Sequence, residues 1–161
     1  MENLHLKSFL EYKFLSNLDF NPEGKNLAFS LSESDYEKNS YKHYIYSLNT
    51  ETKEIRKLTH FGKEKNSLWL NNDIILFSSD RDTDIEEKKK LGETWTLFYA
   101  LDIKNGGEAY EYMRLPLDVS NIKIVDENNF ILLADYDNNS YNLNDLKGEE
   151  REKVIKEIEE N

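Results

Sequence analysis

The side chains that most often carry out hydrolysis are sparse in this sequence and fall in separate predicted elements. The three histidines are His5, His43 and His60, and there is no cysteine. His43 lies in a predicted β-strand, where a packed or hydrogen-bonded histidine is far more common than a catalytic base. None of the glycines flanks a serine in the Gly-x-Ser-x-Gly arrangement of an α/β-hydrolase nucleophile. Since no serine, histidine and carboxylate can be grouped into a triad, we expect no catalytic residue in this chain.

Three aspartates at alternate positions come nearest to a metal site. Asp80, Asp82 and Asp84 repeat the spacing at the start of an EF-hand calcium loop. The match then ends, because Ile85 stands where that loop needs glycine and Leu91 where it needs a bidentate glutamate. We interpret the segment as a loop of solvated carboxylates and expect no metal-binding residue.

Cofactor-binding patterns are missing from the sequence as well. Gly106 and Gly107 lie in a predicted hairpin turn with no helix behind it, which a phosphate-binding loop would need. Histidine or cysteine pairs with the spacing of zinc ligands do not occur. We therefore expect no cofactor-binding residue and no cofactor.

The overall charge restricts the partners. The 161 residues carry a formal net charge of −11, which opposes binding to nucleic-acid phosphates and to anionic membranes. The basic cluster Lys88 to Lys90 directly follows two glutamates. No apolar run approaches the length of a membrane span, and the N-terminus lacks the pattern of a secretory signal. The absence of cysteine is consistent with a reducing compartment, so we expect a cytoplasmic protein.

The elements that would position a site repeat along the chain. The turn Asn21 to Lys25 leads into the alternating strand 26–32, followed by a polar loop, a tyrosine-rich strand, a second turn and a short closing strand. The same order returns from about residue 66, and it begins a third time near residue 119. The aligned positions are Ser30, Ser78 and Ala134, offset by 48 and 56 residues, and Leu48 and Leu101, offset by 53.

A period near fifty residues with four short strands per copy is typical of β-propeller blades. The middle strands DIILF, TLFYAL and FILLA are apolar on both faces, as a blade covered on both sides requires. An antiparallel sandwich with regular hairpin lengths is the alternative. The predicted fold class is all-β: about two and a half antiparallel four-stranded blades of an incomplete propeller, with a C-terminal helix.

The predicted boundaries follow from these patterns. We expect a partial propeller at residues 1–143 and a charged helical tail at 144–161. The helix starts at about Glu149, and its narrow apolar stripe fits a solvated helix or a docking helix for a partner. The blades are expected at about residues 13–60, 65–116 and, in part, 119–137. The strands are expected at residues 13–20, 26–32, 43–48, 54–58, 66–70, 74–79, 94–101, 108–114, 122–125 and 130–134.

Two runs carry a resemblance to a known family. The segment from Lys13 to Glu64 combines a Asn-Pro-Glu-Gly-Lys turn and its strand with the hairpin LNTETKEIRKLT. Further on, Trp69-Leu70 is followed by DIILFSSDRD. These features resemble the first blades of prolyl oligopeptidase family peptidases, nearest to the bacterial acylaminoacyl-peptidase or dipeptidyl-aminopeptidase branch. The resemblance covers residues 13–137. Thr52 stands where the family's first hairpin has glycine.

The resemblance implies a serine peptidase whose propeller filters access to an α/β-hydrolase domain. That domain, with its Ser-Asp-His triad, would lie downstream of Asn161, so no catalytic residue can be carried onto this chain. We expect a non-catalytic, inactive propeller fragment that gates peptide substrates and can self-associate through its unclosed edge. The alternative is a free-standing propeller-type interaction module, and an enzyme complete in 161 residues is the weakest hypothesis.

Overall fold

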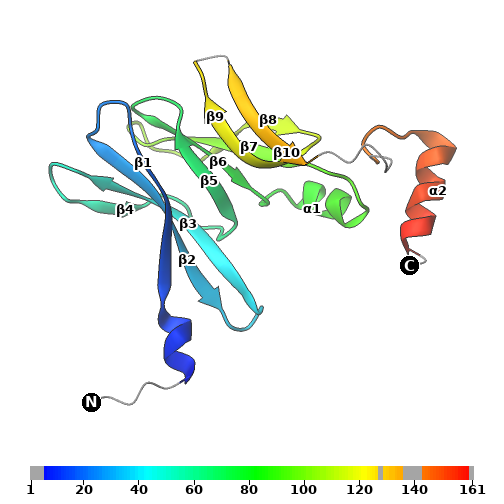
Figure 1. Cartoon of the computed structure of the whole chain (residues 1–161), viewed down its shortest axis with the longest axis horizontal. Coiled ribbons are helices and arrows are strands. Elements are labelled where there is room, and N and C mark those ends of the chain that lie inside the picture. The colour runs from blue at the N-terminus through cyan, green and yellow to red at the C-terminus, as the bar shows by residue number, and fades with distance from the viewer. Residues whose placement is uncertain (1–5, 127–128, 136–142, 160–161) are drawn as a thin grey trace. The chain divides into compact units, whose positions relative to one another are not determined.

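Strands dominate the described part of the chain. The computed structural model describes residues 6–126, 129–135 and 143–159. These residues fall into two compact units, one within residues 1–78 and 100–110 and the other within 79–99 and 111–161. Three sheets, two α-helices and the 3₁₀ helix η1 (Leu6–Glu11) make up the described part (Figure 1). None of the described helices is long and apolar enough to cross a membrane.

The first sheet is an antiparallel meander of four strands in sequence order. Its strands are β1 (Lys13–Phe20), β2 (Asn26–Asp35), β3 (Ser40–Asn49) and β4 (Ile55–Lys57). The long hairpin of β2 and β3 pairs Asn26 with Asn49 at one end and Asp35 with Ser40 at the other (Figure 1). The turn before β2 is held by the Asn21 side chain, which accepts the N–H of Asn26 at 3.0 Å.

The second sheet repeats this order. Its strands are β5 (Glu64–Trp69), β6 (Ile74–Ser79), β7 (Thr96–Asp102) and β8 (Tyr110–Leu115). Ile75, Leu76, Phe77, Phe98 and Ala100 in its two middle strands are completely buried. Neighbouring residues in a strand point to opposite faces, so these strands are covered on both sides, as predicted. The helix α1 (Thr83–Lys90) lies between β6 and β7 in the sequence.

Within the first unit, β5 packs against the first sheet. It contacts β1, β2 and β3. The turns that follow β1 and β5 are also joined: the Asn72 carbonyl accepts the side-chain N–H of Asn21 at 3.2 Å, and Asn72 exchanges two hydrogen bonds with Glu23, of 3.0 and 3.1 Å. Residues about fifty positions apart are therefore in contact. This separation equals the period of the sequence repeat.

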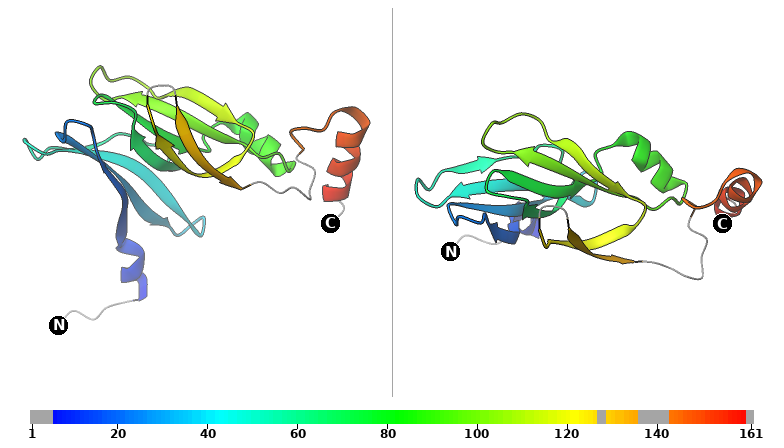
Figure 2. Two further views of the ribbon diagram at one scale, coloured as in Figure 1. Left: turned by 45° about the horizontal axis from the view of Figure 1, so that its top comes forward. Right: turned by 90° about the horizontal axis from the view of Figure 1, so that it is seen from above.

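The third sheet has two strands, β9 (Asp118–Ile124) and β10 (Phe130–Asp135), in an antiparallel hairpin (Figure 2). Thr96 connects it to the start of β7: its hydroxyl donates to the Leu117 carbonyl at 2.7 Å and accepts the Val119 N–H at 3.0 Å. The second helix, α2 (Gly148–Glu159), is mostly exposed. It is tied to the segment before β7 by an ion pair between Arg151 and Glu93. The solvated helix and the docking helix both stay predictions.

A backbone irregularity recurs in the first strand of each sheet. Asn17 in β1 and Asn66 in β5 both have a left-handed backbone, with φ of 51° and 52°. The register of β1 against β2 shifts between Ser16 and Asp19, and that of β9 against β10 shifts opposite Leu133 and Ala134. Asparagine tolerates the left-handed region better than other residues with a side chain. Register shifts typical of β-bulges therefore occur in the first and third sheets, and left-handed asparagines in the first strands of the first and second.

The strand predictions agree well with the structure, whereas two helical segments were not predicted. Strands occur at all ten predicted places, with β1 and β6 at the predicted bounds and β2 and β3 extended toward their shared turn. The loop of solvated carboxylates is wrong: residues 83–90 form α1, because the Asp82 side chain caps its N-terminus by accepting the N–H groups of Asp84 and Ile85. The 3₁₀ helix η1 was not predicted. The blade bounds 13–60, 65–116 and 119–137 remain predictions.

The first hairpin also needs a correction. The family resemblance places the replaced glycine at Thr52. The residue with a left-handed backbone is Lys53, at φ 62°. Gly106, at φ 73°, is in the equivalent hairpin of the second sheet. The side chains of Asn49 and Asp102 accept two backbone N–H groups each at the start of these hairpins. Lys53 and Gly106, four residues later in both cases, therefore have the same role.

Candidate functional site

A serine and a histidine do meet in the first sheet. Ser32 and His43 are directly opposite each other in β2 and β3. Their Oγ and Nδ1 atoms are 2.7 Å apart, a hydrogen-bond distance. Both side chains are half-buried. The prediction that His43 is a packed or hydrogen-bonded strand residue is confirmed. His60 lies outside this pair, in the loop before β5, and His5 lies outside the described residues.

The surroundings of His43 favour its neutral form. Burial is the main cause that lowers the pKa of His43, and the charge of Lys65 lowers it further, while Glu64 acts in the opposite direction. A neutral imidazole could in principle accept a proton from Ser32. A triad also needs a carboxylate that orients the histidine. Glu64 is completely buried, and one of its carboxylate oxygens accepts the backbone N–H groups of Gly62 and Lys63, at 3.0 and 3.1 Å.

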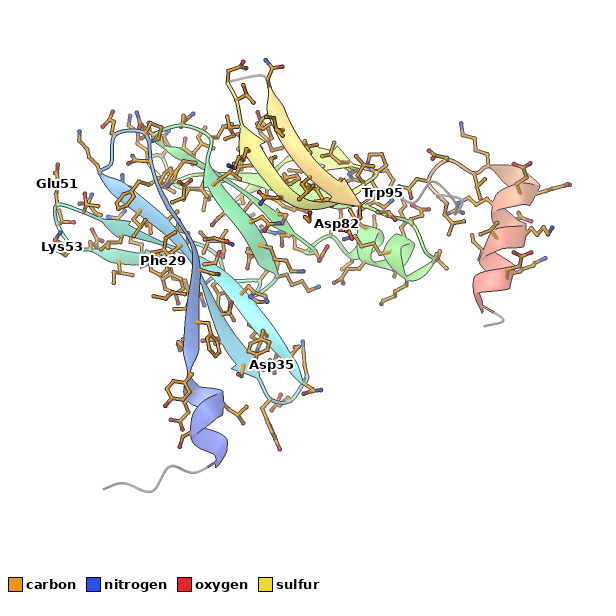
Figure 3. All side chains as sticks on the ribbon, viewed as in Figure 1. Phe29, Asp35, Glu51, Lys53, Asp82 and Trp95 are labelled. Carbon is orange, nitrogen blue, oxygen red and sulfur yellow. The ribbon has the colours of Figure 1, made fainter. Side chains whose placement is uncertain are left out.

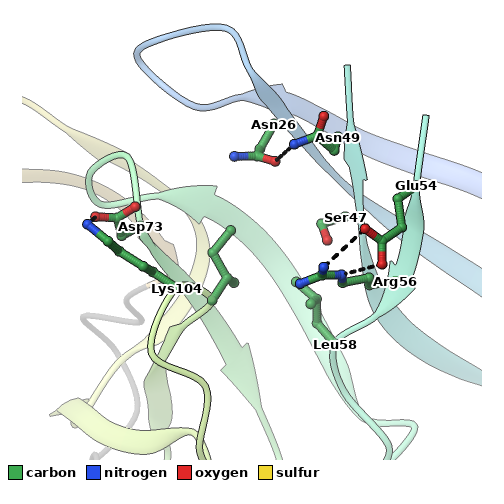
Figure 4. A pocket seen from close by; sticks show the side chains of 9 residues that line it. Asn26, Ser47, Asn49, Glu54, Arg56, Leu58, Asp73 and Lys104 are labelled. Atoms are coloured by element: carbon green, nitrogen blue, oxygen red, sulfur yellow. Dashed lines mark hydrogen bonds and ion pairs between the residues drawn. The ribbon is translucent and has the colours of Figure 1, made fainter. Parts of the chain in front are cut away.

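The first unit also contains a polar cavity of about 270 Å³. Two ion pairs line it (Figure 4). Arg56 donates to both carboxylate oxygens of Glu54, at 2.8 and 3.0 Å, and Lys104 lies 3.4 Å from a carboxylate oxygen of Asp73. The hydrogen bonds from Arg56 are the main cause that lowers the pKa of Glu54. Both members of that pair are therefore charged at neutral pH.

The cavity has the chemistry of a small polar binding site and lacks that of a catalytic one. Each cation in its wall already faces an anion, so a charged ligand would have to displace a partner. Ser47 supplies a hydroxyl group, but neither histidine of the described residues is among the lining residues. Ligand sites are usually larger and more apolar. The cavity is large enough for water or a small polar molecule.

The aspartates singled out from the sequence do not converge. Asp82 caps α1 and lies 3.5 Å from Arg114. Asp80 pairs with Lys89 at 2.5 Å, and Asp84 stands in the first turn of the helix. Among the described residues, no group of three or more potential ligands could hold a metal ion. A sequence signal for the helix did exist: acidic residues follow Asp82 and three lysines end the segment, which suits the dipole of a helix.

The comparisons with known proteins identify the fold. No protein-family model and no curated protein matches the chain. The structure of Pyrococcus horikoshii acylaminoacyl peptidase matches 72% of this chain and 16% of its own length, with 16% identity and a TM-score of 0.55. An acylaminoacyl peptidase in complex with Z-Gly-Gly-Phe-chloromethyl ketone matches the same shares of the two chains, with 19% identity and a TM-score of 0.52.

A separate propeller domain gives a similar result. The β-propeller domain of the Trilobed protease from Pyrococcus furiosus, described as having an open velcro topology, matches 71% of this chain and 31% of its own length. The identity is 16% and the TM-score 0.50. These likenesses confirm the resemblance and the incomplete propeller at the level of the fold. This chain spans about one sixth of the length of the two acylaminoacyl peptidases.

Proposed function

We propose that the chain is the first part of the propeller of a prolyl-oligopeptidase-like serine peptidase. In this proposal it admits peptide substrates to an α/β-hydrolase domain encoded downstream of Asn161 and takes no part in the chemistry. The two complete blades correspond to residues 13–60 and 65–116, and residues 119–137 begin a third. The protein would act in the cytoplasm.

One observation carries the proposal. Two consecutive four-stranded sheets are followed by the start of a third, and 72% of the chain matches each of two acylaminoacyl peptidases in structure. The sequence motifs that resemble this family lie in the same elements: the Asn21–Lys25 turn precedes β2, and Asp80 to Asp82 follows β6. Agreement between local motifs and sheet order supports this family over other propellers.

The chemistry of the described residues fits a supporting role. Among the described residues, Ser32 and His43 come nearest to a nucleophile and a base, and one carboxylate oxygen of Glu64 accepts two backbone N–H groups. A propeller that filters substrates needs none of these groups to be reactive. Peptide hydrolysis would depend on a serine, an aspartate and a histidine of the downstream domain.

The proposal is tested with a fluorophosphonate probe for active serines and with acyl-peptide and dipeptidyl chromogenic substrates. The 161-residue chain is expected to be neither labelled nor active. Stoichiometric labelling of any serine, which Ser32→Ala would trace to the Ser32–His43 pair, would overturn it. The product of the coding sequence extended past residue 161 is expected to contain further blades, then Gly-x-Ser-x-Gly, and to react with the probe. A stop codon after Asn161 would favour a free-standing interaction module.

A further inference from the structure

The free edge of the third sheet, strand β10, exposes large apolar side chains. β10 pairs with β9 on one side only among the described residues. Two of its apolar side chains point to solvent: Ile131 is 63% exposed and Leu133 is 65% exposed. The alternate residues Phe130 and Leu132 are half-buried, and the ring of Phe130 meets that of Tyr112 edge to face at 6.3 Å. An exposed apolar edge strand is a template for pairing with another chain.

The backbone of β10 is also available for pairing. At the turn, the Val125 N–H donates to the Asn129 carbonyl at 2.9 Å. Hydrogen-bonded and non-hydrogen-bonded pairs alternate along an antiparallel ladder, and Phe130 is the next residue, opposite Ile124. The backbone N–H and C=O groups of Phe130 and Leu132 therefore point away from β9, toward the free edge.

We propose that the 161-residue chain forms a two-fold symmetric dimer in which the β10 strands of two copies pair antiparallel about Leu132. The resulting sheet, β9-β10-β10-β9, has four strands, like the first two sheets. Leu132 faces Leu132 of the other copy, and Phe130 faces Ala134, so that outward-pointing backbone groups meet. Ile131 faces Leu133 of the other copy, which makes the exposed side chains cross-strand neighbours.

The distribution of charge favours this strand and permits this register. β10 carries one charged residue, Asp135, in a chain whose net charge is −11. In the proposed register Asp135 faces Asn129, so no like charges are opposed within the strand. β1, the other apolar edge, contains Lys13, Asp19 and a bulge between Ser16 and Asp19, and bulges and charges protect an edge from pairing. The sheet of β1 also has its four strands already.

The affinity of the proposed dimer should increase with salt concentration. Two copies with a charge of −11 each repel one another, and between about 0.1 M and about 1 M salt the Debye length falls from about 10 Å to about 3 Å. Apolar contact and backbone hydrogen bonds survive this screening. Sedimentation equilibrium of the purified chain is expected to show a monomer–dimer equilibrium whose dissociation constant falls at least about tenfold over that range. A monomer throughout would overturn the proposal.

A pair of matched variants locates the interface. Leu133→Lys places a charge on the proposed contact, and Leu15→Lys places the same charge on β1, where the leucine is 60% exposed. Both lower the net negative charge, so general electrostatics would strengthen association equally in the two variants. Leu133→Lys is expected to weaken dimerisation at least about tenfold, since charges block edge pairing, while Leu15→Lys does not. The opposite order would assign the interface to β1 and overturn the proposal.

Cysteine cross-linking tests the register. The chain has no cysteine, so single replacements are unambiguous, and the two exposed positions are suited to them. An equal mixture of the Ile131→Cys and Leu133→Cys variants is expected to form a disulfide-linked heterodimer faster than either variant forms a homodimer. Faster homodimer formation would contradict pairing about Leu132. In a longer chain a downstream strand paired with β10 would occupy the same edge, so the measurement uses the 161-residue chain.

Discussion

The indole N–H of Trp69 donates a hydrogen bond of 3.0 Å to the backbone carbonyl of Asp19, fifty residues earlier in the chain. The carboxylate of Asp19 in turn accepts the backbone N–H of Trp69 at 3.3 Å. Trp69 ends β5, Asp19 lies near the end of β1, and Trp69 is only 6% exposed. These two hydrogen bonds join the first strands of two consecutive sheets within one unit, so the tryptophan of the motif has a structural role.

Trp69→Phe keeps a ring and removes the donor. We expect the free energy of unfolding to fall by about 1–2 kcal/mol, from the lost hydrogen bond and the smaller buried ring. Urea denaturation measures it. The control is Trp95→Phe: Trp95 is half-buried and donates to Glu93 at 2.7 Å, and Glu93 keeps its ion pair with Arg151. Trp95→Phe should therefore lower the free energy of unfolding less than Trp69→Phe does. Equal losses in both variants would remove the special role of the Asp19–Trp69 contact.

Among the described residues, Lys53 is the one with a left-handed backbone that is neither glycine nor asparagine. It lies at the tip of the β3–β4 hairpin (Figure 3), with φ of 62°. A residue with a Cβ atom in the left-handed region costs roughly 1–2 kcal/mol, and glycine avoids that cost. Because glycine also makes the unfolded chain more flexible, we expect Lys53→Gly to raise the free energy of unfolding by about 0.5–1 kcal/mol.

The neighbouring position provides the control for this prediction. Thr52 is not among the residues with positive φ, and its hydroxyl accepts the Glu54 N–H at 3.4 Å. Thr52→Gly should therefore lower the melting temperature, whereas Lys53→Gly should raise it. If Thr52→Gly were the stabilising change, the glycine position marked by the sequence comparison would be right and the assignment to Lys53 wrong.

The strands could be predicted because their patterns are local. The run Ile74–Ser79 is apolar on both faces, and the Asn71 side chain closes the turn before it by accepting the N–H groups of Asp73 and Ile74. Both signals lie within a few residues of the strand, and β6 has the predicted bounds. The third sheet was harder, because Ile131 and Leu133 are as apolar as buried residues yet lie on an uncovered face. Composition alone does not reveal whether a face has a partner.

The pair of Ser32 and His43 could have been found from the register of the hairpin. Their sequence numbers add up to 75, as do those of Asp35 and Ser40 at the turn end of the same ladder. Placing the turn between Asp35 and Ser40 therefore sets Ser32 opposite His43. The cavity is different, because β4 supplies Arg56 and a turn outside the first sheet supplies Asp73. No local pattern brings these residues together.

Asp82 stabilises α1 through its side chain. One of its carboxylate oxygens accepts the N–H groups of Asp84 and Ile85, at 3.0 and 3.2 Å, and the other lies 3.5 Å from Arg114 (Figure 3). Asp82→Ala removes both interactions and should lower the free energy of unfolding by about 0.5–2 kcal/mol, as for other helix caps. Asp82→Asn keeps a capping oxygen and removes the charge. In a denaturation measurement, Asp82→Asn should lower the free energy of unfolding clearly less than Asp82→Ala does. Equal losses in the two variants would assign the effect to the ion pair with Arg114.

His43 should make the stability of the chain depend on pH. Its pKa in the folded state lies below the ordinary value of about 6.5, mainly because of burial. Above pH 6.5 both the folded and the unfolded chain hold a neutral histidine, so the full stability is present. As the pH falls through about 6.5, the unfolded chain takes up a proton more readily than the folded one, and stability is lost until the folded-state pKa is reached.

His43→Phe removes this titration and keeps a ring of similar size. The free energy of unfolding of the original chain should therefore fall more steeply between about pH 7 and pH 5 than that of the variant. Subtracting the free energy of unfolding of the variant from that of the original chain cancels the contributions of the other histidines and the carboxylates. Ser32→Ala is the control: it removes the 2.7 Å contact with His43 but leaves the buried imidazole. It should lower stability by about 1 kcal/mol at every pH and keep the slope. Parallel curves for the original chain and His43→Phe would show that His43 titrates alike in both states.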